Sequence, residues 1–168
     1  MFHDQLAPVM DAAGDCVVER LAAVYDLVAD ITRMGEWSPE CYRCEWPDGA
    51  TEAAPGARFR GYNRIRGYRW QRTVAVAVAD HGREFAFTTV DGRTGRHETR
   101  WRYTMEPSPT GSLLTESFEF LWCSIANRTL EMLLPRGRQM NRGIHETLVR
   151  IKHAAEVAHQ SPSQERQA

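Results

Sequence analysis

The chain has 168 residues, a formal net charge of -1 and a pI near 6.6. This length suits one domain with a sizeable core, and the balanced charge argues against a nucleic-acid binder, because phosphate contacts require a basic surface. No apolar stretch reaches the ~20 residues that span a bilayer, and the N-terminus lacks a basic segment followed by an apolar one. We therefore expect a cytoplasmic protein with no nucleic-acid partner and no stable membrane insertion.

Residue patterning divides the chain into one domain and two tails. Residues 1–13 have little periodicity and residues 160–168 are polar with a proline, so we expect both segments to be loose. The domain then covers residues 14–159. Its cysteines are too few and too scattered for a disulfide framework, and we expect free thiols at Cys16, Cys41, Cys44 and Cys123.

The first predicted element of the domain is an amphipathic helix, because apolar residues recur at helical spacing from Leu21 to Ile31. We expect a break near Asp30 and an end near Gly35, since glycine is favoured just after the last helical turn. A strand should follow, beginning at Cys44 and ending at the turn-forming residues 47–49.

The middle of the chain predicts an antiparallel sheet. Arginines alternate along a strand from Arg58 to Arg64 and should face water, so Phe59 and Asn63 should face inward. The strands that follow are joined by turns too short for a parallel crossover helix, which makes the sheet a meander. They are Trp70–Ala79, Glu84–Val90, Arg96–Glu106 and Leu113–Trp122.

A helical pattern closes the domain. Pro135 interrupts it, and the pattern resumes from Met140 to Ala155, which predicts a short helix followed by a long one. The long helix carries an apolar stripe that should pack against the sheet. A helix laid across a curved sheet cannot fill all the space beneath it, so we expect an α+β fold with a hollow interior.

Period-two alternation assigns a face to each residue of the last two strands. Charged positions such as Glu98 and Arg100 should face outward. The predicted inward residues are His97, Thr99, Trp101, Tyr103 and Met105 on one strand, and Leu114, Glu116, Phe118, Phe120 and Trp122 on the next.

Glu116 is therefore a carboxylate on an aromatic face. Burying an unpaired carboxylate costs several kcal/mol, so it must be partnered, solvated or protonated. One interpretation is a structural ion pair with an arginine such as Arg72, which alternation also places inward. The other is a general acid or base that faces a carbonyl-rich ligand, with its pKa raised by the apolar wall.

Three further polar residues each allow a functional and a structural interpretation. Asn63 can bind a ligand carbonyl or hydroxyl, or it can hold a neighbouring backbone group. Tyr103 and His97 can relay protons, although a strand tyrosine more often belongs to the core and a lone histidine more often forms a structural hydrogen bond.

The spacing of Cys41 and Cys44 matches half of a zinc site or a redox pair. No second Cys or His pair stands at suitable spacing, and a redox motif would begin a helix rather than a strand. We therefore expect neither a metal nor a redox site. Phosphate loops and nucleophile elbows are also absent from the sequence, and no cofactor is expected.

Several segments resemble the START-like, or polyketide cyclase/dehydrase (SRPBCC), superfamily, and together they cover almost the whole chain. They are Ala22–Ile31, Met34–Pro39, Pro55–Gly61, Arg83–Phe87, Trp101–Tyr103, Leu114–Phe118 and Thr147–Glu156. The resemblance implies the helix-grip (START/Bet v 1-like) fold, in which a curved seven-stranded antiparallel sheet, two small helices and a long C-terminal helix enclose a hydrophobic cavity.

The resemblance also implies details at the start of the domain. Residues 16–21 occupy the place of the family's first strand, but they lack its usual alternation and its proline-containing turn. By position, Trp37 resembles a tryptophan that lines the cavity entrance in cyclase members. The other interpretation of Trp37 is a hydrophobic plug that packs the small helices on the sheet.

The superfamily leaves three functions open. The first is binding of a hydrophobic, lipid-like or polyketide/aromatic small molecule, with a homodimer allowed through the sheet edges. The second is a polyketide aromatase/cyclase or dehydratase, and the third is an interaction module whose cavity has collapsed. The catalytic candidates are Glu116, Asn63, Arg72 and Tyr103; the ligand-binding candidates are Trp37, Phe59, Trp70, Phe87, His97, Trp101, Phe118, Met140 and Ile144.

Overall fold

In this computed structural model, the described residues are 2–3, 7–9, 17–47, 49–109, 111–122 and 136–160. One antiparallel sheet curls around the molecule, and its order is β1-β8-β7-β6-β5-β4-β3, with β2 also paired to β8. The meander predicted from the sequence is confirmed. Its strands are β3 (Cys41–Glu45), β4 (Arg58–Ile65), β5 (Tyr68–Asp80), β6 (Glu84–Val90), β7 (His97–Ser108) and β8 (Gly111–Phe120).

The N-terminal segment corrects the sequence analysis. Two short strands, β1 (Phe2–His3) and β2 (Ala7–Val9), pair antiparallel with β8, so these residues belong to the sheet rather than to a loose tail. The chain is already helical at Val17, so the apolar stretch from Cys16 to Val18 does not provide the first strand. Such short strands are specified by the open edge of β8 and carry no alternation of their own.

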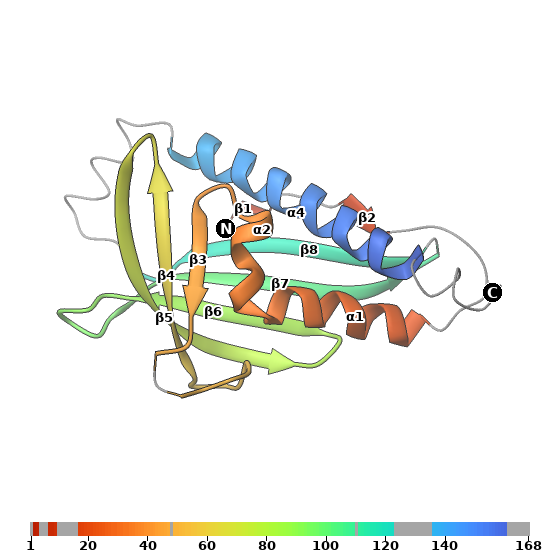
Figure 1. Ribbon diagram of the computed structural model, residues 1–168, viewed down its shortest axis with the longest axis horizontal. Helices are drawn as coiled ribbons and strands as arrows, with labels where there is room; N and C mark the ends of the chain where they lie inside the picture. Colours follow the sequence, from red (N-terminus) through yellow and green to blue (C-terminus); the bar gives the residue numbers. More distant parts are fainter. Residues whose placement is uncertain are drawn as a thin grey trace.

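Three helices cover the concave face of the sheet: α1 (Val17–Ala29), α2 (Met34–Trp37) and the long α4 (Arg136–Gln160) (Figure 1). The predicted break at Asp30 is confirmed, because its side chain accepts a 3.1 Å hydrogen bond from the Thr32 amide and begins a 3-10 turn. The short helix expected before Pro135 lies outside the described residues. Among the helices that are described, none is long and apolar enough to cross a membrane.

Close packing holds α2 against β3. A Cβ atom at Gly35 would lie 2.4 Å from the carbonyl oxygen of Tyr42, so a side chain there would push the helix away from the strand. The core lies between the helices and the sheet, and its most buried members include Ile31, Phe85 and Ile151. The helices leave space above the sheet next to residues of β3, β4 and β5.

Candidate functional site

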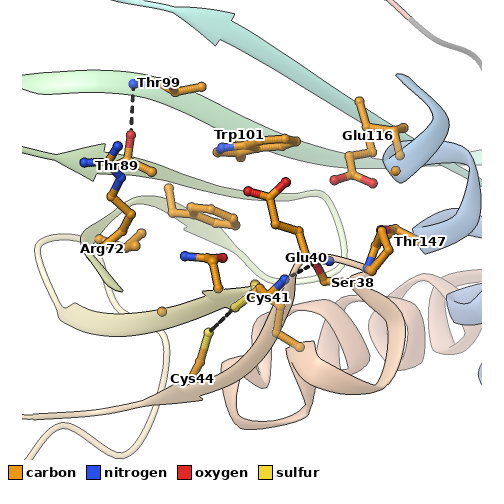
Figure 2. Close-up of a pocket in the computed structure, with 18 of the residues that line it drawn as sticks. Ser38, Glu40, Cys41, Cys44, Arg72, Thr89, Thr99, Trp101, Glu116 and Thr147 are labelled. Carbon is orange, nitrogen blue, oxygen red and sulfur yellow. Dashed lines mark hydrogen bonds between the residues drawn. The ribbon is translucent and has the colours of Figure 1, made fainter. Parts of the chain in front are cut away.

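A cavity of about 490 Å³ lies between the concave face of the sheet, α2 and the N-terminal half of α4. Its volume falls within the range of roughly 300 to 1,000 Å³ that accommodates small organic ligands. Figure 2 shows the rings and polar side chains that surround it. The aromatic residues in its wall are Phe59, Trp70, Phe87, Trp101, Tyr103, Phe120 and Trp122.

Most side chains that the sequence singled out do meet at this cavity. The four catalytic candidates, Asn63, Arg72, Tyr103 and Glu116, all line it. Among the ligand-binding candidates, those in the wall are Phe59, Trp70, Phe87, Trp101 and Ile144. Their chemical roles stay predictions, but their inward orientation agrees with the alternation from which it was predicted.

Trp37 does not line the cavity. Its side chain is 2% exposed within the core, the Arg33 guanidinium lies 5.2 Å from its ring, and its carbonyl oxygen accepts a 3.2 Å hydrogen bond from Arg150. This placement corresponds to the hydrophobic plug, and the expectation of an entrance residue is wrong. The reason is that α2 presses Trp37 into the core next to α4.

His97 also lies away from the cavity, and Glu98 lines it instead. The pairing of β6 with β7 shifts register between Thr89 and Val90, which leaves Glu98 as an extra residue in β7. His97 is exposed and forms a 2.5 Å hydrogen bond between Nδ1 and the Thr88 hydroxyl. The alternation rule therefore failed for these two residues because a β-bulge separates them from Thr99.

Two further candidates are not part of the wall. Phe118 is buried as expected, but its ring packs 5.4 Å from that of Trp101 and 5.5 Å from that of Phe120, and it does not reach the cavity. It supports the aromatic wall from the side. The side chain of Met140 lies outside the described residues.

Glu116 and Tyr103 form the inner end of the cavity. The Tyr103 hydroxyl donates a 2.9 Å hydrogen bond to Oε1 of Glu116, and both side chains are buried. Burial raises the pKa of Glu116 to about 8, although the hydrogen bond from Tyr103 opposes that rise. Within the described residues, Oε2 of Glu116 has no hydrogen-bond partner. The raised pKa favours the protonated form at neutral pH, in which the carboxyl group of this cavity-lining residue is a hydrogen-bond donor.

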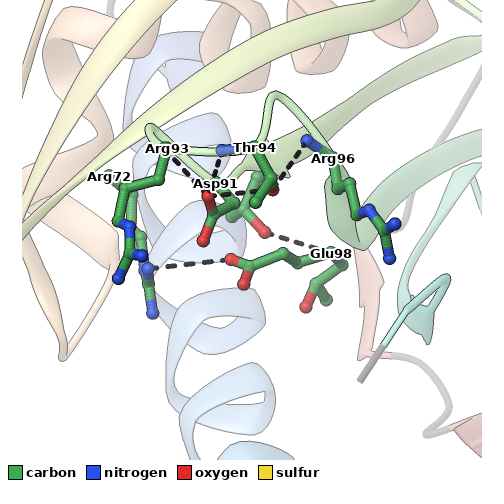
Figure 3. A network of polar contacts seen from close by, with 8 residues as sticks. Arg72, Asp91, Arg93, Thr94, Arg96 and Glu98 are labelled. Atoms are coloured by element: carbon green, nitrogen blue, oxygen red, sulfur yellow. Dashed lines mark hydrogen bonds and ion pairs between the residues drawn. The ribbon is translucent and has the colours of Figure 1, made fainter. Parts of the chain in front are cut away.

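Arg72 and Glu98 stand on the more exposed side of the cavity and form a 3.6 Å ion pair there. Arg72 thus pairs with Glu98 and not with Glu116, which corrects the predicted structural partner of Glu116. Figure 3 shows this ion pair beside the β6–β7 turn, where Asp91 accepts hydrogen bonds from the amides of Arg93 and Thr94. These hydrogen bonds, led by that of Thr94, lower the pKa of Asp91.

Several polar residues of the wall were not predicted from the sequence. Ser38 and Glu40 belong to the short connection between α2 and β3, and the Glu40 side chain points into the cavity (Figure 2). The Ser38 hydroxyl oxygen accepts a 2.9 Å hydrogen bond from the Cys41 amide, which fixes this connection. A connection of this length has no periodicity to reveal its direction. Thr147, by contrast, follows Ile144 by three positions and could have been found from helical spacing.

Comparison with known proteins extends these observations. The family described as polyketide cyclase/dehydrase and lipid transport matches residues 20–156. Among curated proteins, none matches the sequence. A polyketide cyclase-like protein of Corynebacterium glutamicum is 32% identical over 94% of this chain and 91% of its own, with a TM-score of 0.55.

Other solved structures share the fold at low sequence identity. A Nitrosomonas europaea protein is 10% identical over 95% of this chain and 94% of its own, with a TM-score of 0.61. A Staphylococcus aureus protein of unknown function is also 10% identical, covers 95% and 94% of the two chains, and has a TM-score of 0.62. The helix-grip architecture expected from the resemblance is confirmed by these matches.

Proposed function

Because the chain belongs to the polyketide cyclase/dehydrase and lipid transport family, we propose that its cavity binds a hydrophobic small molecule that carries a carbonyl or hydroxyl group. The aromatic wall supplies contact area without directional demands, since each aromatic side chain can bury roughly 150 to 250 Å². One polar anchor then fixes the orientation of the guest.

The observation that carries this proposal is the carboxyl group of Glu116. It is 3% exposed, its Oε1 accepts the hydrogen bond of Tyr103, and its Oε2 has no partner among the described residues. A buried donor without a partner costs about 1–3 kcal/mol, and a ligand carbonyl in the cavity would recover that cost. The guest is therefore an apolar molecule with an acceptor oxygen at its inner end.

A second candidate function is proton transfer to a polyketide, as in a cyclase or dehydratase. Its support is the same carboxyl group, because a pKa of about 8 lies close to the operating pH that favours a general acid. Glu116 would give its proton to a carbonyl oxygen while the adjacent carbon loses a proton to water, which forms the enol, and the Glu116 carboxylate would then take a proton back from that water. Tyr103 would hold the carboxyl group in place, and Asn63 on β4 would hydrogen-bond the enol. This function requires the binding function and adds a reactive substrate.

The test of binding combines native mass spectrometry with fluorescence titration. The purified protein should retain a hydrophobic guest or bind a neutral aromatic ketone, and it should bind that ketone more weakly above pH 8, where Glu116 ionises. Glu116→Gln keeps a donor and should bind the ketone with no such pH dependence. Glu119→Gln, an exposed position on the same strand, is the matched control and should behave as the wild type. A protein that holds no guest and binds no ketone contradicts the proposal.

The same variants separate binding from catalysis. If Glu116 moves a proton, Glu116→Gln should abolish turnover of a polyketone while it still binds the unreactive ketone. Turnover that survives in Glu116→Gln would exclude Glu116 as the acid, and a wild type that binds the polyketone without turning it over would leave only the binding function.

A further inference from the structure

Three sulfur atoms meet on one wall of the cavity. The Sγ atoms of Cys41 and Cys44 lie 3.4 Å apart, and the Sγ atom of Cys44 lies 3.8 Å from Sδ of Met34. All three residues are buried and line the cavity, and Figure 2 shows the two cysteines side by side. The separation of the two Sγ atoms exceeds the ~2.05 Å of a disulfide bond, so both cysteines are thiols.

A β-bulge brings the two cysteines to the same face. Residues three apart in a regular strand point to opposite faces, but the pairing of β3 with β4 shifts register between Cys41 and Arg43. Cys41 and Cys44 are both buried, whereas Tyr42 and Arg43 between them are exposed. The bulge is an observation independent of the sulfur distances, and bulges often re-aim side chains at functional sites.

The strand opposite leaves room for the sulfur atoms. Gly61 pairs with Cys44 across the sheet, and a Cβ atom at Gly61 would lie 3.6 Å from Sγ of Cys41 and 3.8 Å from Sγ of Cys44. A methyl group at this position would make ordinary contact with both thiols, and only a side chain longer than that of alanine would compete with them for the same space. Met34 reaches the pair from α2, so a helix and a strand each contribute to the cluster.

We propose that Cys41, Cys44 and Met34 form a binding site for a monovalent, thiophilic metal ion, and that this ion is Cu(I). Thiolate and thioether ligands are soft and favour Cu(I), zinc and iron–sulfur clusters over harder metals. Metal–sulfur bonds of about 2.3 Å place the sulfur ligands of one ion roughly 4 Å apart, close to the separations found here. The open cavity gives the ion a path to these buried atoms.

The ligand set disfavours zinc. Structural zinc sites use four Cys, His or carboxylate ligands, and the part of the chain that the structure describes holds no group of three or more His, Cys, Asp or Glu that could bind a metal. The absence of a second Cys or His pair in the sequence argued against a metal at these cysteines. A thioether from another element supplies a different ligand set, suited to a softer ion.

The test is an anaerobic titration of the reduced, full-length protein with Cu(I), in competition with the chromogenic chelator bicinchoninate. The protein should withdraw one Cu(I) per chain, and X-ray absorption should show only sulfur neighbours. Cys41→Ser and Cys44→Ser should each lose this binding. Met34→Leu, a nearly isosteric change that should fold, should weaken it roughly tenfold.

Matched variants separate the site from other thiols. The double variant Cys16→Ser/Cys123→Ser keeps the cluster and should bind one Cu(I) as the wild type does. Circular dichroism checks that each variant is folded. The proposal is overturned if the wild type withdraws no Cu(I), if the Cys16/Cys123 variant loses it, if Met34→Leu binds as tightly as the wild type, or if Zn(II) is held as strongly.

Discussion

The two ends of the cavity use carboxyl groups in opposite ways. At the inner end, Glu116 is buried, hydrogen-bonded to Tyr103 and protonated at neutral pH because burial raises its pKa to about 8. At the more exposed end, Glu98 forms an ion pair with Arg72, whose side chain is 45% exposed. A neutral carboxyl group therefore stands where water is excluded, and a paired one stands where solvent screens the charge.

This difference between the two carboxyl groups indicates which end of the cavity distinguishes one ligand from another. The exposed ion pair contributes little energy, since solvent screens it and both groups can exchange partners with water. The Glu116 carboxyl group is buried and does not exchange hydrogen bonds with water. A guest with an acceptor atom next to it therefore gains a hydrogen bond that water does not supply. We expect the inner end to select the ligand and the exposed end to admit it.

The largest expected effect comes from filling the cavity with a large side chain. Thr99 lines the cavity, and its backbone amide donates a 3.1 Å hydrogen bond to Thr89 that a substitution preserves. Thr99→Trp should weaken binding of a neutral aromatic ketone by about a hundredfold or more, measured by fluorescence titration. Arg100→Trp places the same side chain on the exposed face and is the control. Equal binding by both variants would show that the guest does not occupy this cavity.

The next effect is the dependence of stability on pH. The folded-state pKa of Glu116 is raised from 4.5 to about 8, so the folded protein binds a proton that the unfolded chain has released. The free energy of unfolding should therefore fall between pH 4.5 and 8, by a few kcal/mol, and then level off. Glu116→Gln should remove this decline and be more stable than the wild type at pH 8. Urea unfolding at a series of pH values measures it, and identical slopes in both proteins would contradict the burial of Glu116.

A smaller effect is expected from removing the tyrosine that holds Glu116. Tyr103→Phe leaves both carboxyl oxygens without a protein donor and should destabilise the fold by about 1–3 kcal/mol in urea unfolding. It should also raise the pKa of Glu116 further, since the hydrogen bond from Tyr103 lowers it. Tyr68→Phe, at a position that is 71% exposed, is the control and should change neither quantity. An unchanged pKa in Tyr103→Phe would show that the two groups do not interact.

The smallest effect is expected at the exposed end. Arg72→Gln breaks the 3.6 Å ion pair with Glu98 and should change the free energy of unfolding by less than about 1 kcal/mol. The measurement is urea unfolding at low and high salt, with Arg83→Gln as a control at another exposed pair. A loss as large as that of Tyr103→Phe would remove the contrast between the two ends.

Alternation along β5, β7 and β8, together with the short turns between the strands, was sufficient to predict the meander. In β6, by contrast, the residues from Phe85 to Thr88 are all buried. The same rule placed Glu116, Tyr103 and Trp101 in the cavity. Helical spacing likewise placed Ile144 there. Where the backbone is regular, the spacing of apolar and polar residues in the sequence predicts which way a side chain points.

The predictions from sequence fail where the backbone departs from regular strand geometry. They also fail where a contact with a residue distant in the sequence determines the local structure. A bulge in β7 turned Glu98 toward the cavity against the predicted face, and a bulge in β3 brought Cys41 to the same side as Cys44, which the sequence did not predict. No residue in the sequence marks either bulge. Arg72 forms its ion pair with Glu98 rather than with Glu116 because the bulge turns the Glu98 side chain toward it. The pairing of β1 and β2 with β8 depends on an edge that only the folded sheet provides.

The central claim is that the buried, protonated carboxyl group of Glu116 faces the guest. Carbon-13 NMR of the Glu116 carboxyl group, titrated with pH in the presence and absence of a neutral aromatic ketone, tests it most directly. We predict a midpoint near 8 without the ketone and a higher midpoint with it, because the ketone binds the protonated form. A midpoint near the ordinary 4.5, or one that does not move when the ketone is bound, would contradict the claim.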